Sequence, residues 1–321
     1  MVLSVPASGV KTTYEYYVWG SPDDVVTATS GGLLLAGGDS DVADAMLWMI
    51  AKSGGGDFLV IRCSGTDAYN PWIYKQLGGV DSCETIIFVK EEACYDAFVL
   101  DKIRSAEALF IAGGDQWDYV SMWKGTPVED AIHYVAAKPA PVGGTSAGLA
   151  VLGEFVFSAQ NDTIESDDAL RNPYNRRVTI ENDFLSMDNM EGTITDSHFV
   201  TRDRMGRLVT FLARIVQDGR ATQARGIGIN EKTALGVEPN GDVKLFGLCD
   251  AYSSAYFLLT PGPPEVCEPK TPLTYLDISV YRITATGSFN LARWEGVGGV
   301  AYSLLSVDGV LASDQADGSI Y

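Results

Sequence analysis

Short apolar runs alternate with helix-like segments between residues 31 and 150, and this alternation constrains the fold more than any other feature. The apolar runs are GGLLLAGG, DFLVIRCSG, ETIIFV, EALFIAGGDQ and APVGGTSAG. Segments with helical apolar spacing separate them, among them DVADAMLWMIAKSG, NPWIYKQLG, AFVLDKIRSA and PVEDAIHYVAAK. Apolar strands that alternate with helices are typical of a parallel sheet covered on both faces. The sequence therefore predicts a doubly wound α/β fold with a mostly parallel sheet.

The pattern changes twice further along the chain. Residues 158–188 are polar and predict a surface excursion, which could serve as a lid. The strand-like segment GTITDSHF, the helix-like RMGRLVTFLARIVQDG and the strand and hairpin of ARGIGINEKTALGVEPNGDVKLFG follow. From about Pro263 short alternating segments predict a small β extension. We expect one α/β domain over residues 1–262 and a β extension over residues 263–321 that packs on it.

Composition excludes several classes of function. The net charge of −19 repels phosphate backbones, so we expect no nucleic-acid partner, whereas cationic ligands are attracted. No run of about eighteen apolar residues is present, so we expect no membrane partner. The start of the chain lacks the basic and apolar segments of a signal peptide. A cytoplasmic protein and a secreted protein whose signal peptide is absent from this chain both remain open.

The stretch GGTSAG offers a candidate nucleophile. Ser146 lies between Gly144 and Gly148, after an apolar strand and before a helix-like run, as in a G-x-S-x-G nucleophile elbow. The sharp turn exposes the serine Oγ, and the amide of Ala147 faces the same point and can hold an oxyanion. The alternative is a small residue in a tight glycine turn.

A nucleophilic serine needs a base, and the chain has two histidines. His133 lies inside a helix and is expected on the flank of the fold. His198 ends the apolar segment GTITDSHF, so we expect it at the same sheet edge as Ser146. Glu231 ends the next strand, in GIGINEKTA, and can orient the imidazole. A buried structural histidine and an exposed turn carboxylate are the alternatives.

Neighbouring loops supply further candidates. FIAGGDQ ends a strand at Gly113 and Gly114, whose backbone can approach a ligand closely, and Gln116 follows two residues later. Three arginines follow His198, namely Arg202, Arg204 and Arg207. Guanidinium groups bind carboxylates in bidentate fashion, so these arginines are candidates for substrate binding. Alternatively, they pair with Asp196, Asp203 or other nearby acids.

The five cysteines form no Cys-x-x-Cys motif, and His-Glu-x-x-His is absent, so the sequence predicts no metal site. Cys249 and Cys267 could form a disulfide in an oxidising compartment or could be small buried residues. Both remain open.

Together, FIAGGDQ, GGTSAG, DSHFVTRDRMGRL and GIGINEKTA resemble the cyanophycinase and aspartyl dipeptidase (peptidase E) family of serine peptidases. The resemblance spans roughly residues 31–237. It implies a fold like that of class I glutamine amidotransferases, no cofactor or metal, and a homodimer. It also implies a triad, an oxyanion hole and a set of substrate-binding residues. These are Ser146, His198 and Glu231 for the triad, Gly114 and Ala147 for the oxyanion hole, and Gln116, Asp196, Arg202, Arg204 and Arg207 for the substrate.

The resemblance further implies a substrate. Cyanophycinases cleave cyanophycin, a poly-aspartate backbone that carries arginine on its side chains, and release β-Asp-Arg. This chain has Ser197 where the family has glutamine, Asn230 where it has aspartate, and Leu149 where alanine is common. The departures leave the triad intact and leave the substrate open. An aspartyl or isoaspartyl dipeptidase, and a non-catalytic binding protein on the same fold, are the alternatives.

Overall fold

Five parallel strands form the centre of the larger sheet. The computed structural model describes residues 12–247 and 252–321. The strands are β2 (Gly32–Ala36), β3 (Asp57–Arg62), β4 (Ser82–Phe88), β5 (Ala108–Ile111) and β6 (Pro141–Thr145). They lie in the order β4-β3-β5-β6-β2. The mixed α/β fold predicted from the alternating pattern is confirmed.

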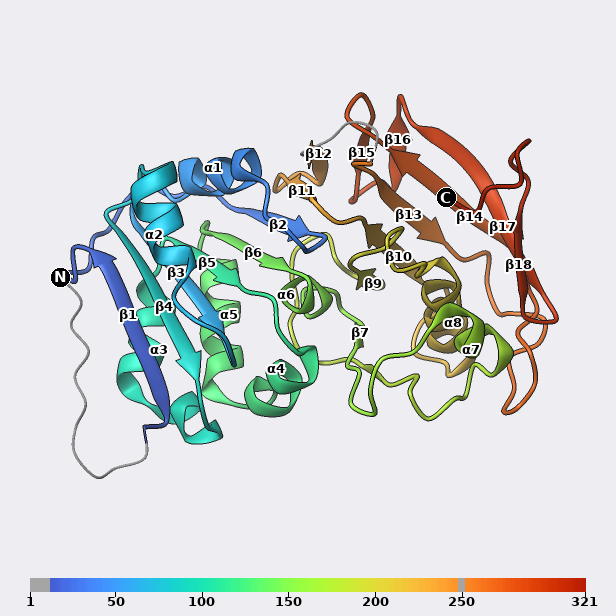
Figure 1. Cartoon of the computed structure of the whole chain (residues 1–321), viewed down its shortest axis with the longest axis horizontal. Coiled ribbons are helices and arrows are strands. Elements are labelled where there is room, and N and C mark those ends of the chain that lie inside the picture. The colour runs from blue at the N-terminus through green and yellow to red at the C-terminus, as the bar shows by residue number, and fades with distance from the viewer. Residues whose placement is uncertain (1–11, 248–251) are drawn as a thin grey trace.

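Helices cover both faces of these strands (Figure 1). Alternate strand residues supply the two cores: Leu34 and Val60 pack on one face, and Leu35 and Ile61 pack on the other. The first face carries α1 (Ala43–Lys52), α2 (Tyr69–Pro71) and the π-helical turn η1 (Trp72–Leu77). The second carries the 3-10 turn η2 (Glu91–Tyr95), α3 (Ala97–Ser105), α4 (Gln116–Trp123) and α5 (Pro127–Ala137).

Antiparallel strands extend this sheet on both sides. β1 (Tyr14–Gly20) pairs with β4, and the sequence pattern did not predict this strand. At the other edge β11 (Thr233–Val237) pairs with β2 and forms the predicted hairpin with β12 (Asp242–Gly247). Two short strands complete the ten-stranded order, β15 (Ser288–Asn290) and β16 (Glu295–Val297).

A second sheet of six strands lies beside the first (Figure 1). Its strands are β9 (Thr193–Asp196), β10 (Arg225–Ile229), β13 (Ala255–Leu259), β14 (Tyr275–Ile283), β17 (Val300–Val307) and β18 (Val310–Ser313). Only β9 and β10 are parallel. The expectation that the strand before His198 shares a sheet with the strand before Ser146 is wrong. β11 occupies the position beside β2, so β9 and β10 form the second sheet with the later strands.

The polar excursion begins directly after the short strand β7 (Val156–Phe157) and contains α7 (Ser166–Arg171) and the strand β8 (Ile180–Glu181), which pairs with β7. α7 packs against α8 (Met205–Gln217), which covers the second sheet. Strands after residue 263 join both sheets, and the domain division at residue 262 stays a prediction.

Two further observations bear on the sequence-based expectations. Within residues 12–247 and 252–321, no helix is long and apolar enough to cross a membrane. Cys267 carries a free, buried thiol, whereas Cys249 lies outside the described residues.

Candidate active site

Ser146 occupies a sharp turn between β6 and the short helix α6 (Ala147–Ala150). Its backbone has φ 54° and ψ −112°, a conformation that non-glycine residues rarely adopt. The two flanking glycines make the turn possible. A Cβ on Gly148 would lie 2.0 Å from the carbonyl oxygen of Ile111, and one on Gly144 would lie 2.4 Å from that of Gly148. The turn therefore needs the glycines of the G-x-S-x-G pattern.

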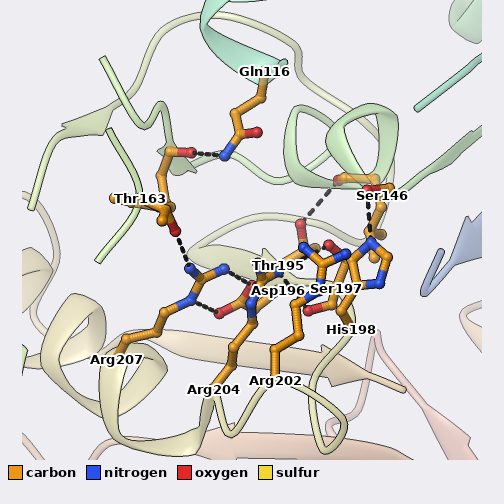
Figure 2. A network of polar contacts seen from close by, with 12 residues as sticks. Gln116, Ser146, Thr163, Thr195, Asp196, Ser197, His198, Arg202, Arg204 and Arg207 are labelled. Atoms are coloured by element: carbon orange, nitrogen blue, oxygen red, sulfur yellow. Dashed lines mark hydrogen bonds and ion pairs between the residues drawn. The ribbon is translucent and has the colours of Figure 1, made fainter. Parts of the chain in front are cut away.

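His198 lies just beyond the end of β9 and reaches Ser146 across the two sheets. Its Nε2 lies 2.9 Å from the Oγ of Ser146 (Figure 2). The backbone amide of His198 donates to the carbonyl oxygen of Gly37, at 2.7 Å, in the loop after β2. A Cβ on Gly38 would lie 2.5 Å from Nε2 of His198, so this loop approaches the imidazole closely because it has no side chain there.

Glu231 lies where the chain passes from β10 in the second sheet to β11 in the first. Its Oε1 is 2.6 Å from Nδ1 of His198, so the three side chains form one hydrogen-bonded series. His133 lies elsewhere, where its Nε2 accepts a hydrogen bond from the amide of Ser186. Of the two histidines, the structure brings only His198 to Ser146.

The surroundings of His198 favour its neutral form. The imidazole is buried, and burial lowers its pKa below the ordinary value, with the positive charges of Arg202 and Arg204 acting in the same direction. The carboxylate of Glu231 opposes the shift. A neutral imidazole is the form that can accept a proton from a serine hydroxyl.

Gly114 and Ala147 carry the two backbone amides expected to form the oxyanion hole. Ala147 is the first residue of α6, so its N–H has no acceptor within the helix. The carbonyl oxygen of Gly113 accepts hydrogen bonds from Tyr119 Oη at 3.2 Å and Arg62 Nη2 at 3.4 Å. Because Tyr119 is fully buried and the peptide is planar, the N–H of Gly114 points away from the core. Gly114 and Ala147 both line the cavity beside Ser146.

The three arginines after His198 have different surroundings. Arg207 is buried and binds Asp196 with two hydrogen bonds, from Nε at 2.7 Å and from Nη2 at 2.5 Å (Figure 2). Arg204 donates to the carbonyl oxygen of Ser197 at 2.8 Å, and burial lowers its pKa to about 10, so it stays charged at neutral pH.

Arg202 is the most exposed of the three arginines. Its side chain is 53% exposed, and its Nε lies 3.9 Å from the Oε1 of Glu231. It therefore has the most freedom to bind a ligand.

A cavity of about 360 Å³ joins these groups. Ser146, His198, the three arginines and Asp196 line it, together with Gln116, whose Nε2 donates to the carbonyl oxygen of Phe157 at 3.2 Å. Three exposed acids, Asp115, Asp162 and Glu165, line it as well. Its wall thus carries both cationic and anionic groups, and its volume suits a ligand of dipeptide size. Among the described residues, no group of three or more His, Cys, Asp or Glu side chains could hold a metal ion.

Sequence reasoning missed residues that support the site. Asn230 accepts hydrogen bonds on Oδ1 from the amides of Val200 and Thr201, both at 3.2 Å, and so holds the loop of residues 197–204, which carries Arg202 and Arg204 and is called the arginine loop below. Gly38 and Tyr119 were also missed. The GG dipeptide after the first apolar run was a signal for Gly38, but no local pattern signals Tyr119 or Asn230.

Comparison with known proteins gives concordant results. A sequence model of peptidase family S51 matches residues 73–244. Cyanophycinase of Trichormus variabilis is 27% identical over 176 residues, which cover 54% of this chain and 53% of the relative. Cyanophycinase of Synechococcus elongatus is 27% identical over 150 residues, 46% of this chain and 42% of the relative. The chain thus spans about half the length of the curated relatives it matches.

A solved structure supports the fold. The crystal structure of a peptidase from an acI-B1 Actinobacterium superposes with a TM-score of 0.50 and 17% identity. The superposition covers 71% of this chain and 91% of that one.

Proposed function

Because the chain belongs to peptidase family S51, we propose that it is a serine peptidase with Ser146 as nucleophile, His198 as base and Glu231 as the residue that orients the base. One observation carries the proposal. The hydrogen-bonded series of 2.9 Å from Ser146 to His198 and 2.6 Å from His198 to Glu231 lies beside a cavity of suitable size.

The reaction follows from this arrangement. Ser146 Oγ attacks the carbonyl carbon, its proton passes to Nε2 of His198, and the carbonyl oxygen becomes an oxyanion that the amides of Gly114 and Ala147 stabilise. The C–N bond then breaks, and Nε2 gives the proton to the leaving amine. Water next gives a proton to Nε2 and attacks the acyl ester, and the proton returns to Oγ as the acid leaves. Glu231 stabilises the imidazolium in both halves.

We propose that the substrate is cyanophycin, cleaved in its aspartate backbone to release β-Asp-Arg. The lining of the cavity supports a substrate with both charges. Arg202 and Arg204 suit its carboxylates, and the exposed Asp115, Asp162 and Glu165 suit its guanidinium groups. The volume of about 360 Å³ also favours a second candidate, an aspartyl or isoaspartyl dipeptidase.

Two measurements test the proposal. A serine-directed fluorophosphonate should label the folded protein at Ser146, and digestion should be compared on cyanophycin, β-aspartyl dipeptides and casein. We expect labelling, cleavage of cyanophycin and little action on casein. Absence of labelling would favour a non-catalytic binding protein, and cleavage of dipeptides alone would favour the second candidate. Casein cleavage as fast as that of cyanophycin would refute the substrate while leaving the triad intact.

The matched variants are Ser146→Ala and Ser121→Ala. Ser146→Ala should lower kcat by several orders of magnitude and leave folding intact, because it removes only the nucleophilic oxygen. Ser121 is exposed on α4, away from the cavity, so its replacement should leave kcat unchanged. Near-normal turnover in Ser146→Ala would exclude Ser146 as nucleophile.

A further inference from the structure

The side chain of Tyr321 contacts the loop of residues 197–204, which joins β9 to α8 and carries Arg202 and Arg204. Its hydroxyl donates to Oδ1 of Asp203 at 2.7 Å and accepts from the amide of Met205 at 3.0 Å. A tyrosine hydroxyl can donate one hydrogen bond while it accepts another. Tyr321 therefore binds the loop through both functions of one oxygen.

The bond to Met205 satisfies the start of a helix. Met205 is the first residue of α8, so its N–H has no acceptor within the helix. Arg204, at the N-cap position, makes no side-chain cap hydrogen bond. The hydroxyl of Tyr321 thus supplies a cap from a distant part of the chain.

The ring of Tyr321 packs against two other aromatic rings, one of them in the loop. It meets Phe199 edge-on, with ring centroids 5.9 Å apart, and Tyr256 edge-on at 5.8 Å. Phe199 directly follows His198. Burial raises the pKa of the Tyr321 hydroxyl, so it remains a neutral donor to Asp203. The main-chain oxygen of Tyr321 accepts from Arg282 of β14 at 3.1 Å, which fixes the residue to the second sheet.

These contacts lie on both sides of Arg202. Asn230 holds the first half of the loop through Val200 and Thr201, and Tyr321 holds the second half through Asp203 and Met205. Arg202 itself has little to fix its guanidinium, since its side chain is 53% exposed and its ion pair with Glu231 is 3.9 Å long. The position of its charge therefore depends on the backbone of the loop.

We propose that Tyr321 is a positioning residue that sets how tightly Arg202 and Arg204 bind the carboxylates of the substrate. The inference rests on the proposed function but goes beyond it, because Tyr321 lies outside the family match over residues 73–244. It gives the β extension a part in substrate binding.

Tyr321→Phe tests this proposal, with Tyr275→Phe as the matched control. Tyr275 is another tyrosine of the β extension, and its hydroxyl also donates to an oxygen, the carbonyl oxygen of Gly262 at 2.6 Å, away from the arginine loop. The substrates are the cyanophycin dimer (β-Asp-Arg)₂ and the same dimer with its carboxylates converted to carboxamides. Amide hydrogen exchange over residues 199–205 reports on the loop without any substrate.

In Tyr321→Phe we expect faster exchange at residues 203–205 and a KM for the carboxylate dimer about three- to tenfold higher, with kcat nearly unchanged. The carboxamide dimer and the fluorophosphonate labelling rate should not change. Unchanged exchange would show that the Tyr321 hydroxyl does not hold the loop. Faster exchange with an unchanged KM would show that holding the loop plays no part in substrate binding. An equal loss of kcat and labelling would mean a merely structural role.

A wild-type protein that cleaves neither dimer would contradict the proposed function. The exchange measurement would then show by itself whether Tyr321 holds the loop. Failure of the proposed function and failure of this inference are therefore distinguishable.

Discussion

Arg202 affects His198 as well as any bound ligand. Its guanidinium lies next to Glu231, and its positive charge is one of the causes that lower the pKa of His198. A protonated imidazole cannot accept the serine proton, so the pKa of His198 sets the acid limb of the activity profile. We expect this limb below the ordinary pKa of histidine, about 6.5.

Arg202→Gln should move the acid limb to higher pH. Removing a positive charge makes protonation of His198 easier, so its pKa rises and activity is lost sooner as the pH falls. Glu231→Gln should move the limb to lower pH, because Glu231 raises the pKa of His198, and it should also lower kcat by about 10²–10⁴-fold. The measurement is kcat/KM against pH for both variants.

Arg293→Gln serves as the control, since Arg293 is exposed and pairs with Asp242 outside the cavity. Equal acid limbs for wild type and Arg202→Gln would mean that the charge of Arg202 does not act on His198.

At this scale, the local pattern predicted the residues that the structure brings together. Ser146, His198 and Glu231 each follow an apolar strand, although the structure brings them together across two sheets and not at the edge of one. Asn230 and Tyr321 could not be predicted in the same way. Their roles depend on contacts with Val200, Asp203 and Met205, which only the folded chain brings near.

The start of α8 and the loop before it carry one buried and one half-exposed arginine. Arg207 points inward from its first turn to the buried Asp196, whereas Arg202, in the loop before the helix, stays half-exposed. Both side chains of the Arg207–Asp196 pair are 4% exposed. Without Arg207, Asp196 would keep only its longer ion pair with Arg204, at 3.4 Å, and most of the cost of its burial would stay uncompensated.

Arg207→Met should therefore lower the free energy of unfolding by about 3–5 kcal/mol. Arg202→Met, which removes an exposed charge, should change it by about 1 kcal/mol or less. Urea unfolding of the two variants beside the wild type measures the difference. Similar losses in both would show that Asp196 does not depend on Arg207.

Helices and strands were predictable where the apolar spacing of their own residues is regular. The parallel strands and α1, α3, α5 and α8 follow from apolar spacing. β1 was missed because YEYYVWG lacks clear alternation. The second sheet was missed for another reason, since the pattern of β9 does not encode which strand it pairs with. That choice follows from β11, which fills the edge beside β2.

For the whole molecule, the net charge of −19 predicts how the guanidinium groups of a substrate affect its association rate. An acidic surface speeds the association of a polymer rich in guanidinium groups, and salt screens this attraction. We expect kcat/KM on a polymer that carries guanidinium groups to fall as salt rises, with kcat little changed. A short neutral substrate should show a weaker dependence. Equal salt dependence on both would exclude long-range attraction.

The homodimer implied by the resemblance stays a prediction. Light scattering can check it by measuring the molar mass in solution.

The distribution of the proposed triad over two sheets has a consequence for the newly made chain. Ser146 follows a strand of the first sheet, His198 follows a strand of the second, and Glu231 lies at the crossing between them. During synthesis the segment with Ser146 leaves the ribosome before those with His198 and Glu231. A nascent or half-folded copy therefore lacks the hydrogen-bonded series of Ser146, His198 and Glu231. The series that we propose for catalysis therefore forms only when the two sheets have come together.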